Sequence, residues 1–152
     1  MDKTILSEEI QNFIANNLDA TIAVLALQKN KFPNTDWTTI LNQIAAKQKA
    51  KSKLPTWFNT PAIYYPGKIS VEQTSSEKTA AYKSELVSGY NLIDLTGGFG
   101  VDDFYFAKKA NQVFHCEINP ELSEIVAHNY EKLGWRTESR WDSGRETAAR
   151  LR

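Results

Sequence analysis

The sequence predicts a mixed α/β chain in which an N-terminal helical bundle precedes the first βαβα portion of a parallel, Rossmann-like sheet. Residues 1–58 carry apolar side chains at helical spacing. Residues 91–103 run from an apolar stretch through an acid and a glycine-rich turn into a short amphipathic helix. Residues 112–117 form a second apolar stretch that ends in another acid. This order is typical of a βαβ unit that holds a nucleoside-containing cofactor.

Three helices are expected in residues 1–58. Ser7, Asp19 and Asp36 each precede a run of helix-spaced apolar residues, so each is expected to be an N-cap. The segment Leu-Pro-Thr-Trp-Phe at 54–58 is expected to end this helical region.

Residues 59–90 are expected to form a linker and one helix that lead into the cofactor site. Two prolines and a glycine predict irregular or extended chain over 59–74. Ser75 or Ser76 can then cap a helix over 77–87. The partial sheet unit follows over 91–134, as strand 91–95, helix 101–110, strand 112–116 and helix 120–133, with Gly134 as the final cap.

Composition indicates an ordinary globular protein. The 152 residues have a formal net charge of zero and are 41% apolar, which removes any global electrostatic argument for nucleic acid. A single cysteine, Cys116, excludes an internal disulfide framework. The longest apolar run, 22–27, is far shorter than the ~20 residues of a membrane span. A soluble, cytoplasmic protein with no membrane partner is expected.

The basic residues change type along the chain. Thirteen lysines precede residue 133, whereas all five arginines fall within 136–152. Residues 135–152 therefore form an atypical Arg-rich tail, which indicates a frameshift, a junction or a truncated gene. A natural basic C-terminal helix over 145–152 is the alternative.

The glycine turn has the chemistry of a cofactor loop. Gly97, Gly98 and Gly100 let the backbone turn sharply and approach a ligand closely. Asp94 ends the first strand beneath this turn, and Glu117 ends the second strand, where a carboxylate accepts hydrogen bonds from a ribose diol.

The acids of the turn discriminate between cofactors. A dinucleotide-binding turn reads G-x-G-x-x-G, but Asp103 stands where the third glycine belongs. A pyrophosphate beside Asp102 and Asp103 would meet two like charges, whereas a sulfonium and an ammonium would not. The alternative for both acids is a first-turn position that favours the helix dipole. The turn therefore favours S-adenosyl-L-methionine over a dinucleotide.

With these residues the chain resembles the class I S-adenosylmethionine-dependent methyltransferases, whose first motif reads acid-x-Gly-x-Gly-x-Gly. Asp94, Gly98 and Gly100 match that motif, and Thr96 replaces its first glycine, with Gly97 adjacent. The resemblance implies an incomplete Rossmann-like methyltransferase sheet, because such folds have about seven strands and two are readable here.

Within that superfamily the chain resembles the RNA-modifying branch that includes the RNA cap guanine-N2 methyltransferases and the THUMP-like bacterial proteins. The supporting segments are Asp-Leu-Thr-Gly-Gly-Phe-Gly at 94–100, Glu-Gln-Thr-Ser-Ser-Glu at 72–77 and Ala-His-Asn at 127–129. The similarity covers about residues 1–134 and implies a methyl acceptor in RNA.

The resemblance also implies roles for individual residues. Asp94, Thr96, Gly97, Gly98 and Gly100 would surround the methionine part of the cofactor. Asp102 would also contact the cofactor. Glu117 would hold the ribose, and Ile118 would pack on the adenine. The upstream residues near the cofactor would be Gln73, Ser75, Ser76 and Thr79. Asp142 is a weaker candidate for an adenine contact, because no third strand leads into it.

No catalytic residue is expected. The Asn/Asp-Pro-Pro-aromatic motif of amino-group methyltransferases is missing from this sequence, so cofactor binding without methyl transfer is the expectation. A dinucleotide-binding fragment and a non-catalytic module that binds RNA or a protein partner remain the alternatives. Self-association through the exposed sheet edge is a further expectation.

Three other groups of residues have both a structural and a functional interpretation. The lysines over 47–53 are read as a solvated helix end rather than an RNA contact. Trp57, Phe58, Tyr64 and Tyr65 could stack on bases but are read as packing residues. His115 and His128 lack partners at ligand spacing, so no metal site is expected.

Overall fold

The computed structural model describes residues 1–135 and divides the chain into two compact units. The first unit comprises Met1–Gln73, and the second begins at Thr74. The predicted Arg-rich tail and Asp142 lie within 136–152, outside the described residues.

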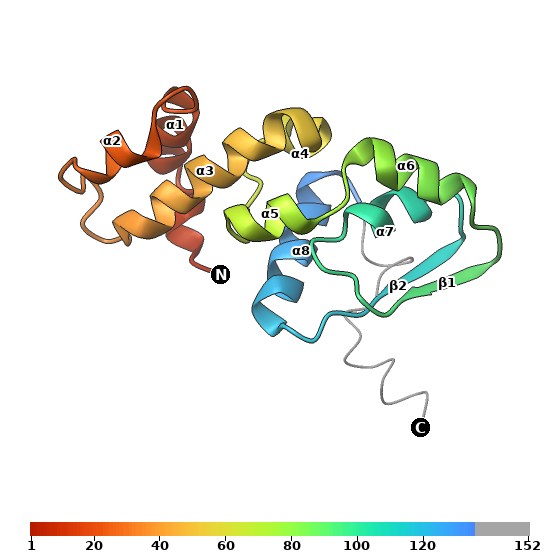
Figure 1. Ribbon diagram of the computed structural model, residues 1–152. Helices are drawn as coiled ribbons and strands as arrows, with labels where there is room; N and C mark the ends of the chain where they lie inside the picture. Colours follow the sequence, from red (N-terminus) through yellow and green to blue (C-terminus); the bar gives the residue numbers. More distant parts are fainter. Residues whose placement is uncertain (136–152) are drawn as a thin grey trace. The chain divides into compact units, whose positions relative to one another are not determined.

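The first unit is all helical. Its longest element, α3 (Trp37–Lys53), contacts α1, α2, α4 and α5 and is visible as the long helix of Figure 1. Buried aliphatic residues of α3, among them Ile40 and Ile44, form its core. The remaining elements are the 3-10 helix η1 (Lys3–Leu6), α1 (Glu8–Asn16), α2 (Ile22–Ala26), α4 (Pro55–Asn59) and α5 (Lys68–Gln73).

Several expectations for this unit need correction. Asp36 is the N-cap of α3 and accepts a hydrogen bond from the Thr39 amide, as predicted. The cap of α2 is Thr21 rather than Asp19. The segment 54–58, expected to end the helical region, contains most of α4, because proline fits the first turn of a helix.

The segment expected to be irregular over 59–74 contains a helix, α5. Gly67 has a φ of 105° and provides the turn that precedes this helix. Val71 of α5 is fully buried, and α5 packs on α3. Tertiary packing therefore stabilises a short helix that the local sequence does not predict.

A buried amide joins α3 to the chain that leads into α5. The Gln43 side chain donates to the Tyr65 carbonyl over 2.6 Å and accepts from the Tyr65 amide over 2.9 Å. Gln43→Leu leaves both backbone groups without this partner, so we expect the free energy of unfolding to fall by about 2 kcal/mol or more. Urea denaturation measures this loss. Lys51→Leu, on the exposed side of the same helix, is the matched control and should change stability by less than ~0.5 kcal/mol.

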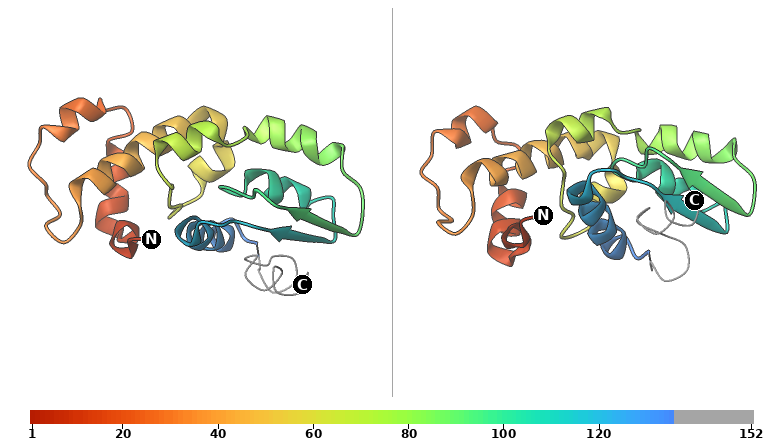
Figure 2. Two further views of the ribbon diagram at one scale, coloured as in Figure 1. Left: turned by 60° about the horizontal axis from the view of Figure 1, so that its bottom comes forward. Right: turned by 90° about the horizontal axis from the view of Figure 1, so that it is seen from below.

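Over residues 74–135, the second unit consists of a two-stranded parallel sheet with three helices. Strand β1 (Asn91–Asp94) pairs with β2 (Gln112–His115) in the register Asn91 to Gln112 and Asp94 to His115. The helices are α6 (Glu77–Glu85), α7 (Val101–Phe106) and α8 (Pro120–Lys132). Figure 2 shows α6 lying along α7 on one side of the strands. This order of strands and helices agrees with the predicted mixed α/β class. Both strands, and the helices α7 and α8, end earlier in the chain than expected.

The residues predicted to cap helices in this unit do so. Ser76 is the N-cap of α6, and its hydroxyl accepts a hydrogen bond from the Thr79 amide. Gly134 follows α8 with a φ of 78°. The Trp135 amide donates to the Tyr130 carbonyl, and the two rings stack at 5.1 Å, so α8 ends in a Schellman motif with its apolar contact.

Helices long and apolar enough to cross a bilayer are not found in residues 1–135.

Candidate functional site

The glycine turn lies between β1 and α7, and the end of β2 holds its backbone. The Gly97 amide donates to the Cys116 carbonyl over 3.0 Å. The Gly98 amide donates to the Glu117 carboxylate over 3.1 Å. The predicted acid of the second strand therefore meets the predicted glycine turn directly.

The three glycines of the turn have different surroundings. A Cβ on Gly97 would lie 2.2 Å from Nδ1 of His115, so this position packs against the imidazole. Gly100 has a φ of 76°, and a Cβ there would lie 2.3 Å from the Tyr130 hydroxyl. A Cβ on Gly98 has only the Thr96 carbonyl nearby, at 3.6 Å. Gly98 is therefore the position where a ligand can approach the backbone.

A buried acid–imidazole pair lies beneath the turn. Nδ1 of His115 is 2.6 Å from Oδ2 of Asp103, and both side chains are at most 1% exposed. Burial raises the pKa of Asp103 to about 6, the hydrogen bond from His115 opposes this shift, and the nearby Asp94 carboxylate adds to it. Asp103 lies in the first turn of α7, as one of the two sequence interpretations had it, but neither interpretation predicted its pairing with His115. The acid at the third-glycine position is the signal that could have found it.

Asp102 is paired within the unit. Its Oδ2 accepts hydrogen bonds from Lys83 over 2.8 Å and from Ser75 over 2.9 Å. Lys83 also donates to the Ser75 hydroxyl over 2.9 Å. This cluster joins α7 to α6 and to the residue before its cap. The negative charge of Asp102 lies beside Lys83, and the carboxylate of Asp103 faces His115.

The remaining acids lie at the ends of the two strands. Asp94 accepts a hydrogen bond from the Thr96 amide over 2.8 Å. Glu117 accepts a second hydrogen bond, from the Asn119 amide, over 2.7 Å. Ile118, the neighbour of Glu117, is 100% exposed. Carboxylates, open backbone and an apolar side chain therefore occur together at the carboxyl ends of parallel strands, where such sheets bind ligands.

The structure gathers part of the predicted set. Ser75 contacts Asp102, whereas Ser76 and Thr79 interact with each other at the start of α6. Gln73 belongs to the first unit. The members at the turn and the strand ends are Asp94, Thr96, Gly97, Gly98, Gly100, Glu117 and Ile118.

The lysines over 47–53 contact acidic, carbonyl or aromatic groups of the first unit. Lys49 lies 3.4 Å from Glu72, and Lys51 lies 3.9 Å from Asp19. Lys53 donates to the Glu72 carbonyl. Lys47 lies over the Phe58 ring, and burial lowers its pKa. Lys49 and Lys51 remain more than half exposed, as expected for a solvated helix end.

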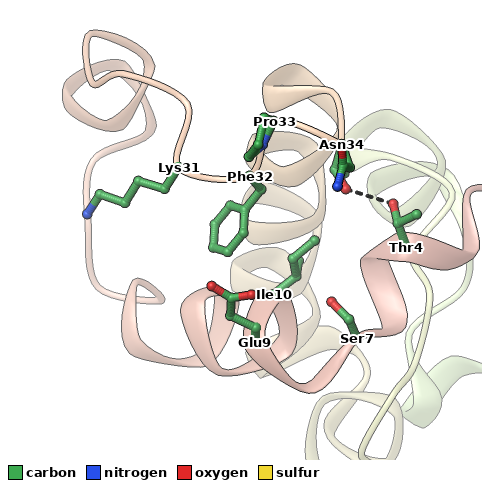
Figure 3. A pocket seen from close by; sticks show the side chains of 9 residues that line it. Thr4, Ser7, Glu9, Ile10, Lys31, Phe32, Pro33 and Asn34 are labelled. Carbon is green, nitrogen blue, oxygen red and sulfur yellow. Dashed lines mark hydrogen bonds between the residues drawn. The ribbon is translucent and has the colours of Figure 1, made fainter.

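The first unit contains a pocket of about 300 Å³. Figure 3 shows Phe32 and Ile10 at this pocket, with Lys31 directed away from it. Thr4 and Thr35, which also line it, are joined by a hydrogen bond of 2.7 Å between their hydroxyls. The pocket contains none of the predicted site residues. Its lining residues are Thr4, Ser7, Glu9, Ile10, Lys31, Phe32, Pro33, Asn34 and Thr35.

Comparison with known proteins gives one solved structure with a similar fold. It is described as "putative methyltransferase from Porphyromonas gingivalis W83", with a TM-score of 0.75 and 27% identity over 97% of this chain. The fold is methyltransferase-like. The match also includes the helical first unit, since it covers nearly all of the sequence.

Two further comparisons bear on the chain. A glutamate–tRNA ligase of Bacillus licheniformis is 27% identical over 130 residues, which is 82% of this chain. Family models give no match. The chain spans 25% of the length of that ligase and 37% of the similar solved structure.

Proposed function

We propose that this chain binds S-adenosyl-L-methionine at the glycine turn and is the cofactor-binding part of an RNA methyltransferase. The observation that carries the proposal is the contact between the Gly98 amide and the Glu117 carboxylate, which brings both halves of the predicted site together. The similarity to a methyltransferase structure supports the class of reaction.

The residues present fit this cofactor. The open face of Gly98 leaves room for a ligand beside the backbone. Glu117 can exchange its hydrogen bond to Gly98 for bonds to a ribose diol, and the exposed Ile118 can cover an adenine. Asp94 offers a carboxylate on the side where the cofactor carries positive charge.

The bound cofactor would supply a methyl group on a sulfonium. The residues of this chain would bind and orient it, while methyl transfer also requires a positioned acceptor. We propose no catalytic residue in this chain, and no methyl transfer by it alone. The curated relative acts on a tRNA by its name, which supports RNA as the acceptor class.

Calorimetry with S-adenosylhomocysteine and with NAD tests the proposal. We expect heat from the first ligand alone. Glu117→Gln should weaken binding about ten-fold, because a hydrogen bond to a charged group is worth about 1.5–3 kcal/mol. Glu131→Gln, an exposed change on α8, removes the same charge and should leave affinity unchanged. Heat from NAD alone would exclude the proposed cofactor.

The alternative function is a non-catalytic module that binds RNA. Neither ligand would then give heat, whereas a labelled tRNA transcript would shift in a gel. A shift together with S-adenosylhomocysteine binding is the result expected for the cofactor part of an RNA methyltransferase.

A further inference from the structure

The two ends of the glycine turn depend on one buried pair. At the N-terminal end of the turn, Gly97 packs on the imidazole of His115 with no space for a Cβ. Beyond its C-terminal end, Asp103 lies in the first turn of α7, three residues after Gly100. The 2.6 Å contact between His115 and Asp103 therefore ties the end of β2 to the start of α7 across the base of the turn.

The other contacts of the turn converge on the same place. The fully buried Tyr130 hydroxyl donates to the Gly100 carbonyl over 2.6 Å, so α8 restrains the end of the turn. The groups that face Asp103 are Asp94 from β1, His115 from β2 and Tyr130 from α8. Among these, His115 contacts both the turn and Asp103.

We infer that Asp103 and His115 are positioning residues that hold the glycine turn in the shape that receives the cofactor. Neither side chain is exposed, so neither touches a ligand from solvent. Their effect passes through Gly97, whose amide bonds to Cys116, and through the adjacent Gly98, whose amide meets Glu117. The expected effect on S-adenosylhomocysteine affinity rests on the proposed function. The expected effect on the rigidity of the glycine turn does not.

The test compares three variants of the full chain. His115→Phe keeps a flat ring beneath Gly97 but removes the donor to Asp103. Asp103→Asn keeps an acceptor for His115. Val113→Ala is the matched control, because Val113 is buried on the same face of β2, two residues from His115, and packs with Ala107 and Ala110 away from the turn.

Amide hydrogen exchange of Gly97 and Gly98 is the first measurement. We expect exchange about ten-fold faster in His115→Phe than in Val113→Ala, and within about three-fold of the original protein in Asp103→Asn, because loss of supporting contacts loosens a site. Strand amides of β1 report general destabilisation and should change alike in His115→Phe and the control. Turn exchange that is no faster in His115→Phe than in Val113→Ala would overturn the inference.

Affinity for S-adenosylhomocysteine is the second measurement. We expect about ten-fold weaker binding in His115→Phe, with the control close to the original protein, since small displacements of a binding loop are costly. Absence of binding in the original protein would contradict the proposed function, and the exchange ratio would still decide the inference. Binding that is equally strong in His115→Phe would contradict the positioning role.

Discussion

Replacing Gly97 with alanine is expected to lower the free energy of unfolding of the second unit by about 3 kcal/mol or more. The new Cβ would lie 2.2 Å from Nδ1 and 2.3 Å from Cε1 of the His115 ring. This ring is fully buried and held by Asp103, so it cannot move aside like the tip of an exposed side chain. Either β2 or the glycine turn must shift.

Gly134→Ala is the matched control for this substitution. Gly134 has a φ of 78°, but a Cβ there meets nothing within 4 Å. Its replacement costs only the left-handed backbone conformation, about 1–2 kcal/mol. Urea denaturation followed by hydrogen exchange of the β1 and β2 amides compares the two variants. A loss in Gly97→Ala no larger than that in Gly134→Ala would show that the packing of His115 on Gly97 is not tight.

The elements that depend on neighbouring residues were predictable from the sequence. Ser76, Asp36 and Gly134 each act within a few residues of their own helix end, and all three have the expected roles. The parallel pairing of β1 with β2 likewise follows from two apolar runs joined by a helix. Within the candidate site, the order of the strands likewise predicted Glu117 at the end of the second strand, and its carboxylate contacts the glycine turn.

Contacts between distant residues account for what the sequence did not predict. Helix α5 forms because Val71 is buried where α5 packs on α3, and nothing in the segment around Gly67 signals that surface. Asp103 and His115 belong to different elements, and only the fold brings them within 2.6 Å. The sequence offered a cofactor or helix-dipole role for Asp103, whereas the structure buries its carboxylate against His115.

The buried acid should also give the second unit a distinct pH dependence. The pKa of Asp103 is raised from 3.8 to about 6, chiefly by burial. Below about pH 3 the carboxyl is largely protonated in both the folded and the unfolded state. Between pH 4 and 6 the unfolded chain loses this proton more readily, so the folded state becomes less stable as the pH rises. Above about pH 7, where the carboxyl is ionised in both states, the penalty is constant.

Asp103→Asn removes this titration and keeps an acceptor for His115. The stability of the original protein relative to Asp103→Asn is therefore expected to fall from pH 4 to pH 7, by up to about 3 kcal/mol for a two-unit shift. Urea denaturation at pH 4, 5, 6 and 7 measures this difference. Val113→Ala introduces no titrating group, so its difference from the original protein should stay constant. A difference for Asp103→Asn that is flat or rises with pH would mean that the carboxylate is stabilised by His115 more than it is destabilised by burial.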